Sequence, residues 1–254
     1  MVKLDSMANH IWSKRFGDSS GERGHAIAAD AEGNVFVAGS MGGGTIDFGG
    51  GGIDGDLFVM KLDASGNHLW SKGYEGFGSG VSAIAADSAG NVVVAGSYYS
   101  TIEFGGGPLA DGNGGAAFVV KLDQHGNHLW SKGLTYSGVP FASSGNCMAL
   151  DASDNVLVAG GFSGTVDLGG GPIVSAHLPN SGKVDAFLLK LDPEGNHLWS
   201  RGYGCDSYCA ASGVAVDELG NAFLTGWFEG TIDLGGGPLT SAGGKDVFVA
   251  KLAP

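Results

Sequence analysis

The chain has 254 residues, of which 43% are hydrophobic and 49 are glycines, and 26 acidic against 13 basic residues give it a net charge of -13. This charge repels phosphate backbones and anionic headgroups, so nucleic-acid binding and membrane-surface binding are disfavoured. The sequence has no apolar run of about 18 residues and no apolar segment near its first residue, so we expect neither membrane insertion nor a leader within this chain.

One phrase recurs along the chain: an apolar strand ending in Lys-Leu, a tight turn, and then a strand with a tryptophan. The tryptophans are Trp12, Trp70, Trp130 and Trp199. The repeat is therefore roughly 60 residues long, which is typical of propeller blades or solenoid turns. Because the copies run along the whole length, we predict one domain over residues 1–254.

Each repeat begins with two short strands joined by a tight turn, as in residues 26–30 and 34–39. A glycine-rich excursion follows, then the Lys-Leu strand at residues 57–63, and a second tight turn leads to the tryptophan strand. Later copies of the first hairpin are residues 83–96, 147–160 and 213–226. Four sequential antiparallel strands make one propeller blade, so the predicted fold class is all-β.

The tight turns share the pattern Asp-x-x-Gly-Asn. The Asp side chain can accept hydrogen bonds from the turn's amides, while Gly takes a left-handed conformation. Asp154 replaces the Gly in one turn, and Asp tolerates this conformation. Ala8 replaces it in the first turn, where the left-handed conformation would cost roughly 1–2 kcal/mol. We therefore predict that the first Lys-Leu phrase does not form its hairpin.

The Lys-Leu phrase occurs five times, but the other three strands occur four times each. We predict a β-propeller of four blades with four antiparallel strands each. Residues 247–252 would be the third strand of the last blade and residues 9–14 its fourth, so that pairing of the N- and C-terminal strands closes the ring. The alternative is a fragment of a larger array with an open or oligomerising edge.

Three segments carry a family resemblance: Gly-Asn-Val-Val-Val-Ala-Gly at residues 90–96, Asp-Val-Phe-Val-Ala-Lys-Leu at 246–252 and Asn-His-Leu-Trp-Ser at 196–200. They resemble the bacterial seven-bladed β-propeller repeat family, and the resemblance covers nearly the whole chain. It implies a propeller in a secreted or surface protein, with no catalytic residues to carry over. The four copies and the longer period depart from the family, so the blade number rests on the count of repeats.

In such a blade the tight turns lie on one face, and the long, variable loops lie on the other. Function on a rigid scaffold usually lies in such loops. Trp227 stands where the other repeats have Ser40, Ser97 and Gly161, and it can stack on a sugar ring, anchor a protein partner or plug the channel. The candidate ligand-binding residues are the aromatic residues that break the repeat: Trp227, Phe228, Tyr98, Tyr99, Phe162 and Tyr136.

The sequence predicts no cofactor and no metal site. One recurring acidic residue per blade would spread around a ring instead of converging on an ion, and the recurring histidines lie on different blades. No nucleotide-binding or hydrolase motif is present. The predicted function is a non-enzymatic recognition or scaffold propeller, a monomer in preference to an oligomer, that binds a glycan or an extracellular protein. The alternatives are a glycan-active hydrolase or lyase with paired carboxylates, and a purely structural repeat module.

Three cysteines are present. Cys147 lies in an apolar strand, where a small core residue is expected, and Cys205 and Cys209 flank Asp-Ser-Tyr in one loop. The loop pair can close a small disulfide ring or stay as two thiols, and no His or further Cys stands nearby in the sequence to complete a zinc site. A disulfide would fit an oxidising compartment, which agrees with a secreted or cell-surface location.

Overall fold

The computed structural model describes residues 1–76, 78–110, 115–134, 136–137, 144–177 and 181–253, and the side chains of 136–137 and 144–146 are outside this description. The regular structure of the described residues consists of β-strands. None of the described segments is a helix long and apolar enough to span a membrane. The predicted all-β class is confirmed.

Four principal sheets follow one another along the chain, and neighbouring strands in each are antiparallel. The first holds β3 (Arg23–Ala29), β4 (Val35–Ser40), β7 (Leu57–Leu62) and β8 (His68–Tyr74). The second holds β9 (Gly80–Ala86), β10 (Val92–Tyr98), β11 (Ala116–Leu122) and β12 (His128–Leu134). The third holds β14 (Ser144–Leu150), β15 (Val156–Phe162), β18 (Asp185–Leu191) and β19 (His197–Tyr203). The fourth has three strands, β20 (Cys209–Val216), β21 (Ala222–Phe228) and β24 (Asp246–Leu252).

Smaller sheets form in the excursions and at the N-terminus. The excursions contribute β5 (Ile46–Asp47), β6 (Gly52–Ile53), β16 (Thr165–Asp167), β17 (Pro172–Val174), β22 (Thr231–Asp233) and β23 (Pro238–Thr240), and β13 (Tyr136–Ser137) pairs with β16. The N-terminal hairpin consists of β1 (Val2–Leu4) and β2 (His10–Ser13). The described residues thus form eight sheets, of which four are the principal ones.

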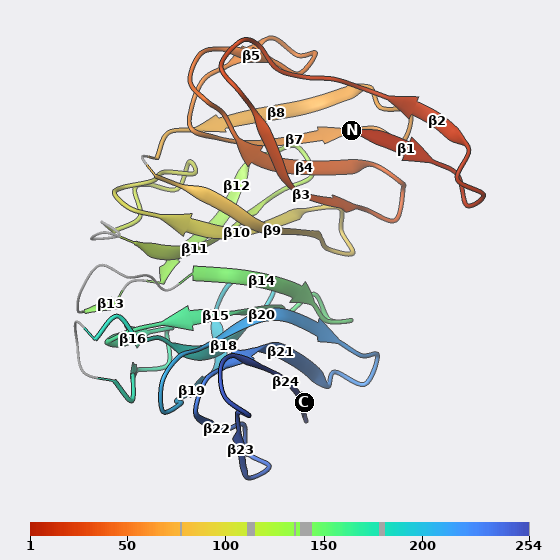
Figure 1. The fold of residues 1–254 in the computed structure, drawn as a ribbon. Coiled ribbons are helices and arrows are strands. Elements are labelled where there is room, and N and C mark those ends of the chain that lie inside the picture. The colour runs from red at the N-terminus through yellow and green to blue at the C-terminus, as the bar shows by residue number, and fades with distance from the viewer. Residues whose placement is uncertain (77, 111–114, 135, 138–143, 178–180, 254) are drawn as a thin grey trace.

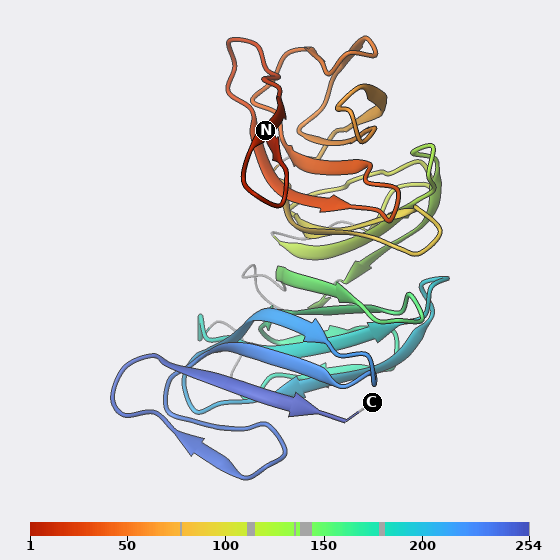
Figure 2. The same ribbon diagram turned by 90° about the vertical axis from the view of Figure 1, so that its right-hand side faces the viewer.

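The principal sheets stack in an arc, with the N-terminal hairpin at one end and β24 at the other (Figures 1 and 2). The first strands of successive sheets lie side by side, since β3 contacts β9, β9 contacts β14 and β14 contacts β20. The cores lie between sheets, around buried aromatic residues such as Phe36, Phe118 and Phe248. This is a propeller-type repeat arrangement.

The prediction of four closed four-stranded blades is wrong. Among the described residues only three principal sheets have four strands, and β2 pairs with β1, with Lys3 opposite Trp12, instead of with β24. The physical reason is that β1 carries the same Lys-Leu phrase as β24 and is joined to β2 by a short turn. Pairing within a hairpin closes only a short loop and so has a low entropic cost. Pairing of β2 with β24 would have to bring together strands from the two ends of the arc.

The prediction that Ala8 prevents the first hairpin is also wrong. Ala8 takes the left-handed conformation, with φ of 63°. The Asp5 carboxylate accepts hydrogen bonds from the backbone N–H of Met7 and of Asn9, each at 2.8 Å, and the Asp5 N–H donates to the Asn9 carbonyl at 2.9 Å. These are the turn bonds seen in the later repeats, and together with the β1–β2 pairing they offset the strain at Ala8.

Two recurring contacts explain the repeated phrase. The Lys of the third strand reaches across the second strand to the Asp of the first turn, and the Nζ–Oδ2 distances are 3.2 Å for Lys61–Asp30 and 2.8 Å for Lys121–Asp87. Trp12, Trp70 and Trp130 each donate the indole N–H to a carbonyl in the second turn of the following sheet, as Trp130 does to that of Pro193 at 3.0 Å. The first contact ties each sheet together, and the second ties the N-terminal hairpin and the first two sheets to the sheets that follow them.

Candidate functional site

The strand β24 forms an edge of the fourth principal sheet. It pairs with β21 over seven residues, from Asp246 opposite Phe228 to Leu252 opposite Ala222. In the three complete, four-stranded sheets the corresponding third strand also pairs with an outer strand, β8, β12 or β19. No described strand pairs with that side of β24. Val247 and Val249 are therefore 75% and 70% exposed. An edge of this kind is a template for pairing with another strand.

The ion pair beside this edge differs from its equivalents in the complete sheets. Lys251 lies 3.5 Å from Asp217, and their side chains are 54% and 30% exposed, whereas those of Lys121 and Asp87 are 6% and 3% exposed. The hydrogen bond from Asn221 is the main cause that lowers the pKa of Asp217. The absence of a fourth strand in the described sheet leaves this pair in contact with water.

The glycine-rich excursion of the fourth repeat lacks a contact that the others make. In the first three repeats the middle glycine lies against the histidine of the outer strand, so closely that an added methyl group at Gly50, Gly106 or Gly170 would overlap the ring. In the fourth repeat, no heavy atom lies within 4 Å of the place that a methyl group added to Gly236 would occupy. The Asp233 carboxylate still accepts hydrogen bonds from the N–H of Gly235 and of Gly237, at 2.7 and 3.2 Å. The loop therefore keeps the arrangement that receives an outer-strand histidine.

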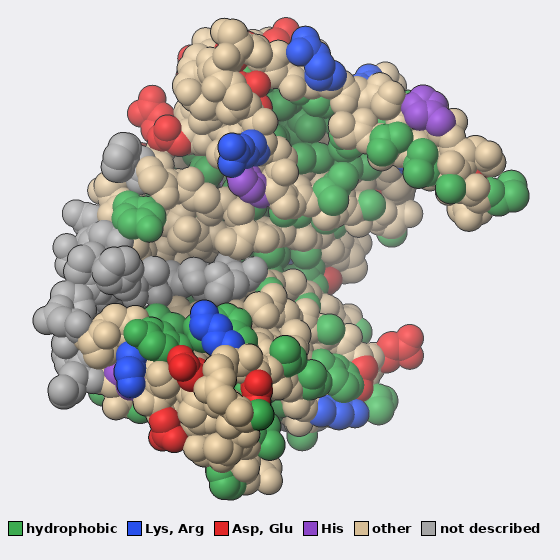
Figure 3. Space-filling model, in the orientation of Figure 1, with side chains coloured by type: hydrophobic (Ala, Val, Ile, Leu, Met, Phe, Trp, Pro, Cys, Tyr) green, Lys and Arg blue, Asp and Glu red, His purple; other side chains and the backbone are tan. Residues whose placement is uncertain are grey.

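These three features define one candidate site, which we call the β24 edge: the free side of β24, the side chain of Lys251 and the loop Gly235–Gly237. Its natural complement is a strand with the outer-strand pattern. In the complete sheets that strand places Trp opposite the repeated Lys, as in Lys61↔Trp70 and Lys121↔Trp130. The strand β2 carries the same pattern, His10-Ile-Trp-Ser13. Exposed hydrophobic side chains lie along the N-terminal hairpin and on β24, and Figure 3 shows those of the hairpin.

The loop face, proposed from the sequence as the ligand site, holds fewer exposed aromatic residues than expected. Tyr98, Phe162 and Phe228 are at most 3% exposed and belong to the core, and the Tyr98 hydroxyl donates to the Ala110 carbonyl at 2.8 Å. As folded here, these three cannot stack on a ligand. Each ends a second strand, and the first repeat has the buried Met41 just after the end of its own second strand. An apolar residue near this point in all four repeats is the signal of a core position.

Two of the predicted aromatic residues do reach the surface. Tyr99 is 49% exposed. Trp227 is half-buried, and the Lys245 ammonium lies 3.8 Å from the centre of its ring. Tyr136 has its backbone in β13, but its side chain lies outside the described residues. The structure therefore does not gather the six predicted residues into one binding surface.

The loop face of the first two sheets contains an acidic hollow of about 660 Å³. Its walls come from two excursions and the loop between them, and its acidic residues are Asp54, Asp56, Glu75 and Glu103. The Thr45 hydroxyl donates to Asp54 at 2.5 Å, and the Gly76 N–H donates to Asp56 at 2.8 Å. The hollow suits a ligand with positive charge or several hydroxyl groups.

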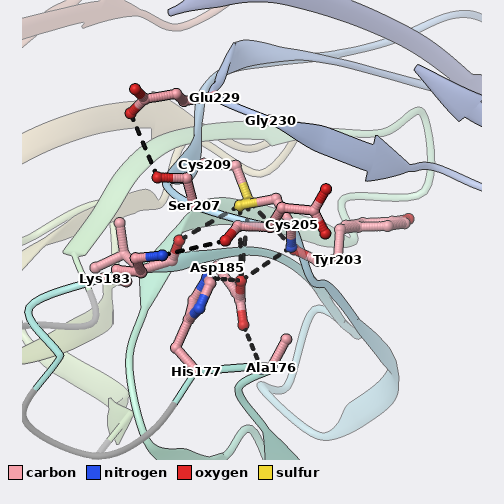
Figure 4. Close-up of a disulfide and its surroundings, with 12 residues drawn as sticks. Ala176, His177, Lys183, Asp185, Tyr203, Cys205, Ser207, Cys209, Glu229 and Gly230 are labelled. Carbon is pink, nitrogen blue, oxygen red and sulfur yellow. Dashed lines mark hydrogen bonds and ion pairs between the residues drawn. A yellow bond between two sulfur atoms is a disulfide. The ribbon is translucent and has the colours of Figure 1, made fainter. Parts of the chain in front are cut away.

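The cysteine pair lies at the start of the fourth sheet. Cys205 and Cys209 form a disulfide, and Cys147 is a free thiol whose pKa is raised to about 11 by burial. The structure places His177, from the loop after β17, and Asp185, from β18, beside the disulfide (Figure 4). The sequence argument found no histidine nearby because it considered neighbours along the chain only.

One distant relative among known proteins agrees with the fold. No family model matches the chain. A segment of 121 residues is 27% identical to an uncharacterized WD repeat-containing protein of Acanthamoeba polyphaga mimivirus. This match covers 44% of this chain and 8% of the viral protein. Among solved structures, a protein of unknown function from Bacteroides caccae aligns over 92% of this chain and 66% of its own, with a TM-score of 0.49 and 11% identity. Raptor from Chaetomium thermophilum aligns over 90% of this chain and 22% of its own, with a TM-score of 0.34 and 11% identity. The distant WD-repeat relative and the repeated antiparallel sheets agree on a propeller-type repeat fold.

Proposed function

We propose that this chain is a non-catalytic recognition module that binds a β-strand at the β24 edge. The observation that carries the proposal is the loop Gly235–Gly237, which is held in place by Asp233 while the position above Gly236 is open. The ligand is a strand of the repeat's own outer type, with His above Gly236 and Trp opposite Lys251. Strand addition combines backbone hydrogen bonds, which supply affinity, with pockets for alternate side chains, which supply specificity.

A peptide with the sequence of residues 8–15 tests this proposal, because it contains the β2 pattern. We expect the labelled peptide to bind residues 1–254 in a fluorescence anisotropy titration. Replacing His10 or Trp12 in the peptide by Ala should weaken binding by about tenfold or more, since each removes a side chain from its pocket. A peptide that shows no saturable binding, or an affinity unchanged by both replacements, contradicts the proposal.

The variant Gly236→Ala provides a second test on the protein side. No heavy atom lies within 4 Å of the added methyl group in the free protein, so stability should not change. In the complex the methyl group would overlap the incoming histidine, as it would at Gly106 with His128. We expect weaker peptide binding, while Gly244→Ala, which also has open space around it, serves as the control. Equal binding by both variants would contradict the predicted position of the strand.

A second candidate function, binding of a glycan or an extracellular protein at the loop face, is favoured by the acidic hollow and the exposed ring of Tyr99. A glycan array and a pull-down test it, each carried out with the parent chain and with the variants Tyr99→Ala and Trp227→Ala. Binding lost in these variants supports the loop face, and turnover of a bound glycan would favour a hydrolase. We further propose that residues 1–254 are one domain of a secreted or cell-surface protein, which the Cys205–Cys209 disulfide supports.

A further inference from the structure

The disulfide lies inside a cluster of potential metal ligands. The distances to Asp185 Oδ1 are 3.4 Å from His177 Nε2, 3.8 Å from Cys205 Sγ and 3.9 Å from Cys209 Sγ. The ligand atoms of His177, Asp185 and Cys205 all lie within 4.8 Å of one another. Zinc binds sulfur at about 2.3 Å and nitrogen or oxygen at about 2.0–2.2 Å, so the ligand atoms of a tetrahedral site lie roughly 3.3–3.8 Å apart. Three side chains therefore lie near the spacing of a zinc site, and Cys209 Sγ is joined to one of them, Cys205, through the disulfide.

The cluster is buried and has an unsatisfied donor or acceptor. The side chains of Asp185 and His177 are 1% and 9% exposed, and the two cysteines are buried. His177 Nε2 is buried without a hydrogen-bond partner, although it lies within ion-pair distance of Asp185. A buried imidazole nitrogen without a partner is unfavourable, and a metal ion would use its lone pair.

Asp185 is held in an orientation that suits a ligand. Its Oδ2 accepts hydrogen bonds from the Ser175 hydroxyl and the Ala176 N–H, both at 2.7 Å, and its Oδ1 accepts one from the Cys205 N–H at 3.2 Å. Oδ1 is also the Asp185 atom that lies within 4 Å of His177 Nε2 and of both sulfurs. Hydrogen bonds of this kind orient ligating carboxylates in known metal sites.

We propose that reduction of the Cys205–Cys209 disulfide turns this cluster into a tetrahedral zinc site with His177, Asp185, Cys205 and Cys209 as ligands. A thiol or dithiol reductant supplies two electrons and two protons, which break the S–S bond and give two thiols, and the reductant becomes a disulfide. Zinc then displaces both thiol protons and binds the two thiolates, the neutral imidazole and the carboxylate. The disulfide closes the loop Cys205–Cys209 on itself, whereas zinc would also tie this loop to Asp185 of β18 and to His177.

Zinc binding to the two redox forms tests the proposal without any mutation. With the metal-free protein in a phosphine reductant, competition with a chromophoric chelator should show one zinc ion bound per chain. The oxidised protein should bind none. Cobalt added to the reduced form should give thiolate-to-metal charge-transfer bands and the intense d–d bands of a tetrahedral complex. Equal zinc binding by both redox forms, or none by the reduced form, would overturn the proposal.

Variants identify the ligands. We expect His177→Ala and Cys205→Ser to weaken zinc binding by the reduced protein at least about tenfold. His125→Ala and Cys147→Ser are matched controls, because neither residue belongs to the cluster, and they should bind zinc like the parent chain. Circular dichroism in the reduced, metal-free state separates loss of a ligand from loss of the fold. Folded His177→Ala protein with unchanged zinc affinity and unchanged cobalt spectrum would refute the assigned ligand set.

Discussion

The buried ion pair between Asp87 and Lys121 offers a sharp test of the repeat's internal packing. Their Nζ–Oδ2 distance is 2.8 Å and their side chains are 3% and 6% exposed. Asp87 Oδ1 also accepts hydrogen bonds from the N–H of Ala89 and of Asn91, at 3.0 and 2.8 Å. Asp87→Asn keeps an oxygen for these turn bonds, but it removes the charge that Lys121 faces and the Oδ2 acceptor of the Asn91 side-chain amide, which donates to it at 2.8 Å.

The expected cost follows from the burial of Lys121. Removing one partner of a buried pair usually costs 3–5 kcal/mol, because the other charge stays buried and uncompensated. Lys121 Nζ still donates to the Pro193 carbonyl at 3.1 Å, so we expect the lower end, about 3 kcal/mol. Against a typical unfolding free energy of about 5–15 kcal/mol, such a loss is easily measured by urea denaturation.

The fourth sheet supplies the matched control. Asp217→Asn changes the same position of the same turn, but its partner Lys251 is 54% exposed. Exposed ion pairs contribute little, so its denaturation midpoint should stay close to that of the parent. In a double-mutant cycle, Asp87→Asn with Lys121→Met should lose less than the sum of the single losses. Equal destabilisation by Asp87→Asn and Asp217→Asn, or strict additivity in the cycle, would refute the argument from burial.

Three further predictions follow from the described contacts. Burial acts to raise the pKa of Asp30, Asp87 and Asp151, but hydrogen bonds from Asn and Lys side chains outweigh burial and leave each pKa below its usual value. The stability that these carboxylates add is therefore present above about pH 4 and is lost as the pH falls through the lower pKa of the folded state. A melting temperature that stays level from pH 5 to pH 2 would contradict this. Gly106→Ala should destabilise the second sheet because the methyl group overlaps His128, which urea denaturation beside the neutral Gly236→Ala can show; equal midpoints would argue against that contact. Thiol titration of denatured, unreduced protein should find one thiol, Cys147, whereas three thiols would show that the disulfide is absent. In the native protein Cys147 should react slowly with alkylating reagents, because burial raises its pKa to about 11.

Much of the local structure could be predicted from the sequence, because the signals are local. Alternating apolar runs and the Asp-x-x-Gly-Asn turns predicted the strands and tight turns, and the structure has those turn bonds in every repeat, as at Asp63 and Asp123. The candidate aromatic residues were harder to interpret, because Tyr98 and Tyr99 are neighbours in the sequence yet one is buried and the other is exposed.

Strand partners and long-range clusters were decided by the tertiary structure alone. The Lys-Leu phrase occurs in both β1 and β24, and the sequence argument chose β24 as the partner of β2, whereas in the structure β2 pairs with β1. The left-handed Ala8 was tolerated because the surrounding turn bonds outweigh its strain. His177, Asp185 and the cysteine pair come from different segments, so their convergence depends on how the third and fourth sheets pack. A sequence specifies local conformation through residues close along the chain, whereas edges and buried clusters depend on which of several equivalent surfaces meet in three dimensions.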